Sequence, residues 1–349
     1  MDPATNHRLI QLRQEILDTV QRELGVQQID LPLFLPVSSP LNDRLNGEEP
    51  VLFNGKDSTP YQIVHSHALI KRFKINKHAD YYQEFTLPSE LPYSVLPVED
   101  GIEVSFIPQN VPKQDKVHGL VSYLQAIRKL EVLDATHSMY VRQSDWCARV
   151  PKLTQQQDKL EILHYFIFRV IKSISTILSD EAIPQDVPFK FFIGSSQTFF
   201  TKYADKLSQL SAANDVTGFE TLRTQWEREI GQKYQYFAIT EIGAKINGLW
   251  PYDLRAHNYD DWEANADIFV WCPALDRSLE VSSMGYRVNA EALQKQLVEA
   301  AVPSDAISTY EQDILDGKVV STIGGGIGLD RLAMLKLKTK TIGEVVDFV

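Results

Sequence analysis

The sequence predicts an α/β (α+β) chain, in which a mainly antiparallel β-sheet is flanked by helices. Segments rich in β-branched and aromatic residues, separated by turns, lie at residues 119–128, 138–146, 234–242, 266–271 and 278–288. Other stretches carry apolar residues at helical spacing. No linker rich in proline, glycine or serine divides residues 1–349, so we expect one domain rather than two.

The N-terminal part predicts a helix between Asn6, which can cap it, and Gly25, which can end it. Its apolar stripe consists of Leu9, Leu12, Ile16, Val20 and Leu24. Residues 29–47 predict a short strand interrupted by prolines and then a polar loop, and residues 61–66 predict another strand.

Further helices are predicted along the rest of the chain. One begins near His67 and carries Lys71 and Arg72, a long one covers about 155–179, and a polar helical segment covers 203–232. The segment LAMLKL, which follows Arg331, also suits a helix.

The composition excludes several classes of protein. With 35 Lys+Arg against 46 Asp+Glu the formal net charge is −11, so nucleic acid is not expected as the main partner. The two cysteines, Cys147 and Cys272, are too few for a disulfide framework and fit a reducing compartment. The N-terminus has no apolar signal region, and no run approaches the ~20 apolar residues that span a bilayer. We therefore expect a cytoplasmic protein without a membrane partner.

The strongest local motif is the glycine-rich segment STIGGGIGLDR at residues 321–331. Its glycines, Gly324, Gly325, Gly326 and Gly328, lack the β-carbon that would keep a backbone away from a flat or phosphate-bearing ligand. Arg331 could stack on a purine or meet a phosphate. Close packing of a strand on a helix would explain the same glycines. The segment is not a Walker loop, because no Gly-Lys-Ser/Thr follows.

A predicted hairpin carries the second motif. Arg128 ends one strand and can clamp an α-phosphate or a carboxylate. Glu131, three residues later, can accept a hydrogen bond from an adenine amino group or from magnesium-bound water. A simple surface ion pair is the alternative interpretation.

Acidic residues on two further strands form the third motif. Asp267 shares a strand face with Phe269 and Trp271, and alternation predicts that Glu280 and Ser282 point to one side. Carboxylates that face one site can hold magnesium on a nucleotide. Alternatively, these acids simply face solvent from an edge strand and bind no ion.

Together these motifs resemble a known family. Arg128 with Glu131 resembles the second signature motif of class II aminoacyl-tRNA synthetases, and GGGIGLDR resembles their third. The whole chain resembles more closely the ammonia-dependent asparagine synthetases, type A (aspartate–ammonia ligases), which share that core. The matching motifs are LNDRLNG at 41–47, HSxAxxKR at 65–72, AIRKxE at 126–131, HSxYVxQxDW at 137–146, RAxxYDDW at 255–262, DIxVWxPxL at 267–275, ExSSMGxRV at 280–288 and TIGGGIGxxR at 322–331.

The resemblance implies a single catalytic domain over residues 1–349 with ATP and Mg²⁺ as co-substrate and cofactor. ATP and L-aspartate would give β-aspartyl-AMP and pyrophosphate, and ammonia would then release L-asparagine and AMP. Residues 7–36 resemble the helix and strand that form the family's dimer interface, which implies a homodimer.

The resemblance also implies roles for individual residues. Arg128 would clamp the α-phosphate and acyl group, and Arg331 would stack on adenine. Asp43 would hold the aspartate ammonium or help the amine arrive. Asp267 and Glu280 would bind magnesium. The amino-acid pocket would be lined by His65, Ser66, Lys71, Gln143, Asp260, Ser283 and Arg287, of which Gln143 would be catalytic and Lys71 and Arg287 would meet the substrate carboxylate.

Some positions depart from the family pattern. The family usually has aspartate where this chain has Arg142 and tryptophan where it has Ser144, and Leu130 in the hairpin loop also differs. Alternation places Gln143 and Asp145 on one strand face and Arg142 and Ser144 on the other, so both exchanges point away from the substrate if Gln143 faces it.

Three alternatives follow from these departures and from the shared core. One is the same adenylation chemistry with another amine or amino acid. Another is an aminoacyl-tRNA synthetase-like transferase, which the acidic net charge and the lack of a separate anticodon-binding domain disfavour. The last is a non-catalytic paralogue, which predicts loss of Arg128, Asp267, Glu280 or Arg331, whereas all four are present.

Overall fold

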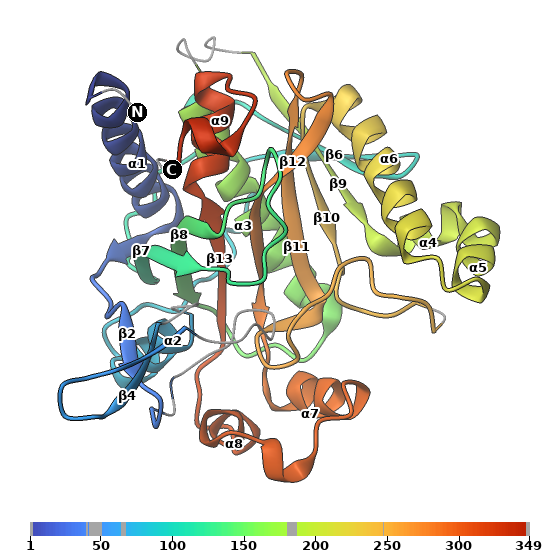
Figure 1. Ribbon diagram of the computed structural model, residues 1–349. Coiled ribbons are helices and arrows are strands. Elements are labelled where there is room, and N and C mark those ends of the chain that lie inside the picture. Colours follow the sequence, from blue (N-terminus) through green and yellow to red (C-terminus); the bar gives the residue numbers. More distant parts are fainter. Residues whose placement is uncertain are drawn as a thin grey trace.

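A ten-stranded sheet is the centre of the described part of the chain (Figure 1). The computed structural model describes residues 3–39, 41, 51–63, 68–179, 187–246 and 248–346. The strand order is β1-β7-β8-β13-β12-β11-β10-β9-β6-β5. The strands are β1 (Val26–Gln28), β5 (Ser94–Val98), β6 (Gly101–Phe106), β7 (Gly119–Ile127), β8 (Tyr140–Arg149), β9 (Phe189–Ser195), β10 (Tyr236–Thr240), β11 (Asp260–Cys272), β12 (Arg277–Arg287) and β13 (Thr322–Gly328).

Most neighbouring strands of this sheet are antiparallel. Only the pairs β1–β7 and β9–β10 run parallel within the described ranges. The predicted α/β (α+β) class with a mainly antiparallel sheet is therefore confirmed.

One face of the sheet is covered by α1 (Pro3–Leu24), α3 (Gln156–Leu178) and α9 (Leu329–Leu337) (Figure 1). The predicted stripe of α1 is buried here, as Leu9 and Ile16 illustrate. The helix ends at Gly25, whose φ of +62° and lack of space for a β-carbon 2.6 Å from the Lys116 carbonyl oxygen favour glycine. Asn6 lies inside α1 and does not cap it, because the helix is already formed at Pro3.

The opposite face carries two separate groups of helices. α4 (Ser196–Lys202), α5 (Ala204–Ala212) and α6 (Val216–Tyr234) cover an aromatic core that includes Phe199, Trp226 and Phe237. α2 (Ala68–Lys77) packs on the other half through Ile75, against Leu120 of β7 and Cys147 of β8. Strand residues that face this side between the two groups are therefore available to a site.

Smaller elements surround this face. β2 (Phe34–Pro36), β4 (Pro60–Ile63) and β3 (Leu52–Asn54) form a second sheet in that order. α7 (Ala290–Glu299) and α8 (Thr309–Leu315) lie at the bottom of Figure 1. Within the described ranges no helix combines the length and apolar character needed to cross a bilayer.

The structure corrects several predicted boundaries. β11 begins at Asp260 rather than 266, and the predicted helical segment 203–232 is divided into α5 and α6 around Asn214, which has a φ of 51°. The strands β5, β6 and β9 and the helices α7 and α8 were not predicted. The predicted strand over 61–66 is seen as Pro60–Ile63, and residues 64–66 lie outside the described residues.

Candidate active site

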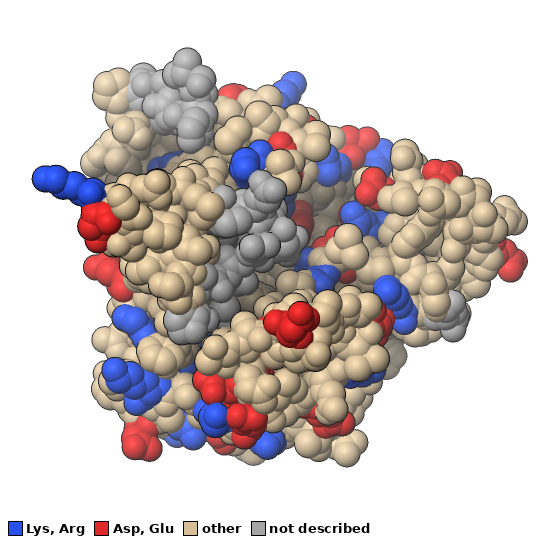
Figure 2. Space-filling view, turned by 60° about the horizontal axis from the view of Figure 1, so that its bottom comes forward, with Lys and Arg blue, Asp and Glu red and all other residues tan. Residues whose placement is uncertain are grey.

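A cavity of about 280 Å³ is lined by residues of β7, β8, β12 and β13 and of the loops that precede β8 and β11. It brings together most of the predicted site residues, namely Arg128, Glu131, Gln143, Asp260, Glu280, Ser283, Gly325, Gly326, Gly328 and Arg331. Figure 2 views the molecule from the side on which α7 and α8 lie and shows this face hollowed near its middle, with acidic and basic side chains in and around the hollow.

The glycines of β13 allow the neighbouring strands to approach closely. A β-carbon on Gly326 would lie 2.5 Å from Oε1 of Gln143, and one on Gly325 would lie 2.6 Å from the Ser283 carbonyl oxygen. Gly328 has room, because its nearest neighbour would be 3.6 Å away. Gly324 does not line the cavity; its missing β-carbon leaves space for the guanidinium of Arg287, 2.8 Å away. Close packing thus accounts for Gly324, Gly325 and Gly326, whereas Gly328 has room for a β-carbon.

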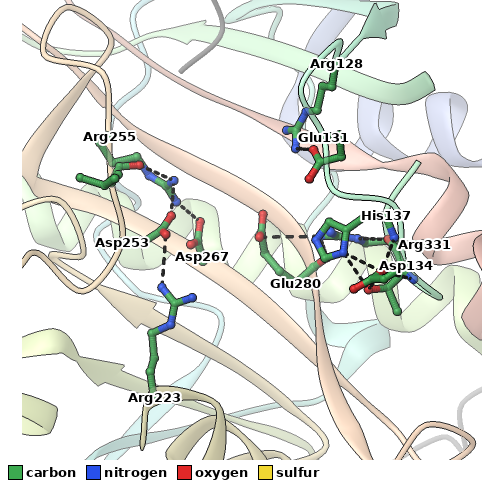
Figure 3. A network of polar contacts seen from close by, with 12 residues as sticks. Arg128, Glu131, Asp134, His137, Arg223, Asp253, Arg255, Asp267, Glu280 and Arg331 are labelled. Carbon is green, nitrogen blue, oxygen red and sulfur yellow. Dashed lines mark hydrogen bonds and ion pairs between the residues drawn. The ribbon is translucent and has the colours of Figure 1, made fainter. Parts of the chain in front are cut away.

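Arg331 lies in the first turn of α9 and reaches the edge of β12. Its Nη1 donates to the Glu280 carbonyl oxygen at 2.7 Å and lies 3.6 Å from the Glu280 carboxylate. Its Nε donates to the Thr136 carbonyl oxygen at 3.4 Å. Figure 3 shows Glu280 between Arg331 on one side and Asp267 on the other.

Arg128 directly follows β7 and lines the cavity. Its backbone N–H donates to the Met139 carbonyl oxygen at 2.7 Å, and its Nη1 donates to Glu131 at 2.9 Å. The two side chains remain 24% and 18% exposed, so this pair contributes little stability and can give way to a stronger anion.

A β-bulge in β12, opposite β11, determines which side chains of β12 lie on the same face of the sheet as Asp267. Ile268 lies opposite Ser282, but Phe269 lies opposite Glu280, so Val281 is the extra residue. The bulge reverses the alternation, and Glu280 shares its side with Ser283 and Asp267. The prediction that Glu280 and Ser282 point together is therefore wrong.

Arg255, which the sequence reasoning did not assign, pairs with Asp267. Arg255 donates to the carboxylates of Asp267 and, at 2.6 Å, Asp253 (Figure 3). Asp253 in turn accepts a hydrogen bond from Arg223 at 3.2 Å. The same arginine, Arg223, lies 3.7 Å from the carboxylate of Glu227. Acids and arginines thus alternate from α6 to the cavity. The motif RAxxYDDW contained this arginine, but nothing in its spacing indicated its partner.

Burial shapes the ionisation of this chain of charges. It raises the pKa of the Asp267 carboxyl well above its ordinary value, and Arg255 opposes this. It also raises the pKa of Glu227 to about 7, against the influence of Arg223 and of the hydroxyl of Tyr252, which donates to Glu227 at 2.8 Å. Burial alone would lower the pKa of Arg255, but Asp267 and Asp253 outweigh it and keep this arginine charged.

The predicted magnesium residues fit an ion that arrives with a nucleotide. No group of three His, Cys, Asp or Glu side chains is arranged for a metal in the described part of the chain. Asp267 and Glu280 are close enough for the charge of Glu280 to act on Asp267. Two carboxylates suffice when phosphate oxygens and water supply the other Mg²⁺ ligands.

A second cluster of charges is buried behind the cavity. Lys71 is fully buried and donates to Asp145 and, at 3.2 Å, to Ser122. Arg287 donates to Asp260 and stacks 4.1 Å from the ring centroid of Tyr259. Burial lowers the pKa of Lys71, opposed by Asp145, and raises the pKa of Asp260, opposed by Arg287.

Among the described residues, this cluster contains more cations than carboxylates. Arg72, which donates to the Val288 carbonyl oxygen at 3.1 Å, adds a third cation to Lys71 and Arg287, whereas Asp145 and Asp260 supply two carboxylates. Nε and Nη2 of Arg287 are buried and have no hydrogen-bond partner among the described residues. One added carboxylate would satisfy both the charge and these donors.

The remaining predictions divide into two groups. Asp43, His65 and Ser66 lie outside the described residues, so their roles stay predictions. Gln143 and Arg142 both line the cavity, but the Arg142 side chain extends towards α9, where its Nε donates to Asp330 at 3.0 Å. Ser144 is fully buried. This agrees with the alternation expected for β8.

Comparisons with known proteins show which proteins the chain is similar to. A family model described as aspartate-ammonia ligase matches residues 4–86 and 112–348. The aspartate–ammonia ligase of Lactobacillus acidophilus is 31% identical over 348 residues, which cover 98% of this chain and 89% of that protein. The corresponding ligase of Limosilactobacillus fermentum is 32% identical over 347 residues, with the same coverage of 98% and 89%.

Solved structures share the fold at low sequence identity. An asparaginyl-tRNA synthetase of Entamoeba histolytica in complex with asparaginyl-adenylate matches with a TM-score of 0.55 and 12% identity, over 98% of this chain and 66% of that one. An asparaginyl-tRNA synthetase of Pyrococcus horikoshii matches with a TM-score of 0.55 and 12% identity, over 98% and 68%. The predicted class II aminoacyl-tRNA synthetase-like core is confirmed.

Proposed function

The chain belongs to the aspartate–ammonia ligase family, and we propose that it forms L-asparagine from L-aspartate and ammonia while ATP is converted to AMP and pyrophosphate. One observation carries this proposal. Arg128 and Arg331, whose guanidinium groups could meet phosphate, line a cavity that also reaches Asp145 and Asp260 of the buried cluster, whose described residues include more cations than carboxylates. A nucleotide and a small acidic molecule would therefore meet in one place.

The buried cluster is the proposed aspartate site. The α-carboxylate of aspartate would accept from Nε and Nη2 of Arg287, with Lys71 as a second cation nearby. Asp260 and Ser283 line the same part of the cavity. Selectivity for a ligand that carries a carboxylate follows, because a ligand without one would leave the arginine donors unsatisfied. Asp43 belongs to the same proposal as the residue that holds the aspartate ammonium or helps the amine arrive, and His65 and Ser66 belong to it as residues that line the amino-acid pocket.

Adenylation joins the two substrates. An oxygen of the β-carboxylate bonds to the α-phosphorus of ATP while the bond to the β-phosphate oxygen breaks and pyrophosphate leaves. Arg128 exchanges Glu131 for the α-phosphate, and Arg331 holds the adenine and phosphates beside Gly325, Gly326 and Gly328. Glu131 is then free to accept from the adenine amino group. Stabilisation of developing negative charge by arginines placed in advance is the main catalytic contribution.

Amidation completes the reaction. The nitrogen of ammonia bonds to the acyl carbon, the bond to the AMP oxygen breaks, and the proton that the new amide loses passes to water. Gln143 is the residue placed to orient this step, since its amide lies in the cavity against Gly326. A neutral amide can hold ammonia or the acyl oxygen but does not titrate, so Gln143 positions the reactants and does not serve as the base.

Mg²⁺ is part of the proposal as an ion held by Asp267 and Glu280. When bound, it would neutralise charge on the phosphates of ATP and on the departing pyrophosphate. Arg255, which donates to one carboxylate oxygen of Asp267, would hold that side chain in position beside the ion.

The same proposal covers assembly and location. We propose a single catalytic domain that acts as a homodimer through residues 7–36, where β1 is an edge strand of the large sheet and the apolar side chains of Leu33 and Phe34 are exposed. A cytoplasmic location fits Cys147 and Cys272, which are buried free thiols. Neither a nucleic acid nor a membrane is proposed as a partner.

A product assay tests the proposed function. Purified protein is supplied with ATP, Mg²⁺, L-aspartate and ¹⁵N-ammonium, and the products are followed by NMR. We expect side-chain-labelled asparagine and AMP in equal amounts. Formation of ADP in place of AMP, or label in another amide when amino acids are mixed, would contradict the proposal and favour a different ligase.

A further inference from the structure

Asp330 and Arg331 are adjacent in the first turn of α9, yet their side chains point to different sides. Both residues line the cavity, but Arg331 reaches Glu280, whereas Asp330 is 4% exposed and its carboxylate contacts Arg142. Nε of Arg142 donates to both oxygens of Asp330, at 3.0 and 3.2 Å, and Nη2 lies 2.7 Å from Oδ1. Arg13 of α1 lies 3.5 Å from the same oxygen.

The two arginines also hold the end of the described chain. Arg13 donates to the Val345 carbonyl oxygen at 3.1 Å, and Arg142 donates to it at 3.3 Å. The backbone N–H of Ile342, three residues earlier, donates to the Ala135 carbonyl oxygen at 2.7 Å. A single set of contacts thus connects α1, β8, α9 and the loop after Arg128, and Figure 1 shows α1 beside α9.

The start of α9 depends on these contacts because it has no side-chain cap. Its N-cap residue is Gly328, which offers no side-chain acceptor to the first turn. The bidentate contact between Arg142 and Asp330 fixes the direction of that turn, since a guanidinium and a carboxylate that share several contacts have little rotational freedom. The direction of Arg331, one residue further on, follows from it.

We propose that Asp330 is a positioning residue for the nucleotide site, which acts through Arg142, Arg13 and the C-terminal segment to keep Arg331 directed at ATP. The inference rests on the proposed function for the identity of the nucleotide. It gives a role to Arg142, one of the positions at which the chain departs from its family's usual residue. Asp330 itself does not touch the substrate in this account.

Electrostatics alone makes the opposite prediction. Removing the negative charge of Asp330, which lies at the wall of the cavity, would attract the polyanion ATP and tighten its binding. Loss of positioning would weaken binding, because Arg331 would no longer be held in its productive direction. The sign of the change therefore separates the two explanations.

Glu23 provides a matched control. It is a buried acid of α1 that also lies between two cations, Lys172 at 2.6 Å and Arg169 at 3.3 Å, and it does not line the cavity. Glu23→Gln and Asp330→Asn each remove a buried negative charge that is paired with two cations. Both should therefore lower stability, but Glu23→Gln should not affect nucleotide binding. A second test variant, Arg142→Lys, keeps the charge and removes the bidentate geometry.

Calorimetric binding of the non-hydrolysable analogue α,β-methylene-ATP, with Mg²⁺, is the measurement. We expect Asp330→Asn and Arg142→Lys each to raise the Kd by about ten-fold, and Glu23→Gln to leave it unchanged. If Asp330→Asn does not fold, Arg142→Lys alone decides. An unchanged or lower Kd in the test variants would overturn the inference. A wild-type protein that binds the analogue but makes no asparagine would instead contradict the proposed function.

Discussion

The side chain of Gln143 occupies the space left by the missing β-carbon of Gly326. A β-carbon there would lie 2.5 Å from Oε1 of Gln143, across the contact between β13 and β8. The glycine-rich strand therefore sets the position of the Gln143 amide, which we propose to orient the reaction of ammonia with the adenylate.

Gly326→Ala tests this relationship. The added methyl group meets only the far end of a flexible side chain, so we expect the fold to survive and Gln143 to be displaced. The kcat for asparagine formation should fall at least about ten-fold, because a misplaced reactant group is costly. Gly343→Ala is the control, since its β-carbon would find its nearest atom at 3.9 Å. Equal kcat in both variants would remove Gln143 from the proposed step.

Arg128→Ala should lower turnover by about 10²–10³-fold and leave the melting temperature nearly unchanged, because one preorganised donor to the transition state is lost. The ion pair that it breaks is partly exposed and contributes little stability. Arg228→Ala, which breaks the exposed pair with Asp276, serves as the control in the same steady-state assay. Near-normal turnover of Arg128→Ala would exclude this arginine from the mechanism.

Asp267→Asn should raise the Mg²⁺ concentration needed for half-maximal rate, since a neutral amide is a weaker ligand for a hard cation. Asp253→Asn is matched to it, because both acids accept from Arg255. A magnesium titration of both variants is the measurement. If the Mg²⁺ requirement rises equally in Asp267→Asn and Asp253→Asn, the effect comes from the altered Arg255 and not from a lost magnesium ligand.

Arg287→Lys should raise the KM for aspartate by about ten-fold with little change in the KM for ATP. The substitution keeps the charge but removes the two donors that have no partner among the described residues. Steady-state kinetics with each substrate varied in turn checks this. A KM that rises for ATP alone would move Arg287 out of the aspartate site.

Glu311 should make stability depend on pH in the acid range. Burial opposes its ionisation, but hydrogen bonds from His257 and Ser308 outweigh burial and lower the pKa of Glu311 to about 2. A group with a depressed folded pKa stabilises the native state above its unfolded pKa and loses that contribution as pH falls towards 2, here roughly 2–3 kcal/mol. Urea unfolding of wild type and Glu311→Gln should converge between pH 5 and about 2. A constant difference would contradict this assignment.

Much of the fold could be predicted from local patterns. The long helices and the strands β7, β8 and β12 carry continuous apolar periodicity, so their positions agree with expectation to within a few residues. β5, β6 and α7 were missed because their side chains are only partly buried or their apolar pattern is short. The bulge at Val281 was not predictable, since one extra residue reverses alternation without altering composition.

The candidate site was predicted through its motifs more than through its geometry. The residues around the cavity stand in segments that the sequence singled out, but their partners are distant along the chain. Arg142 and Asp330 are 188 positions apart, and Arg255 and Asp267 join a loop to a strand. Pairing of this kind depends on how β8, β11 and α9 meet, which no local pattern contains.

The most direct test of the central claim is ATP–pyrophosphate exchange with Mg²⁺ across a panel of amino acids, without and with ammonium. The account predicts exchange that depends on L-aspartate, and net formation of asparagine and AMP once ammonium is added. Exchange with a different amino acid, or no exchange with any of them, would contradict it.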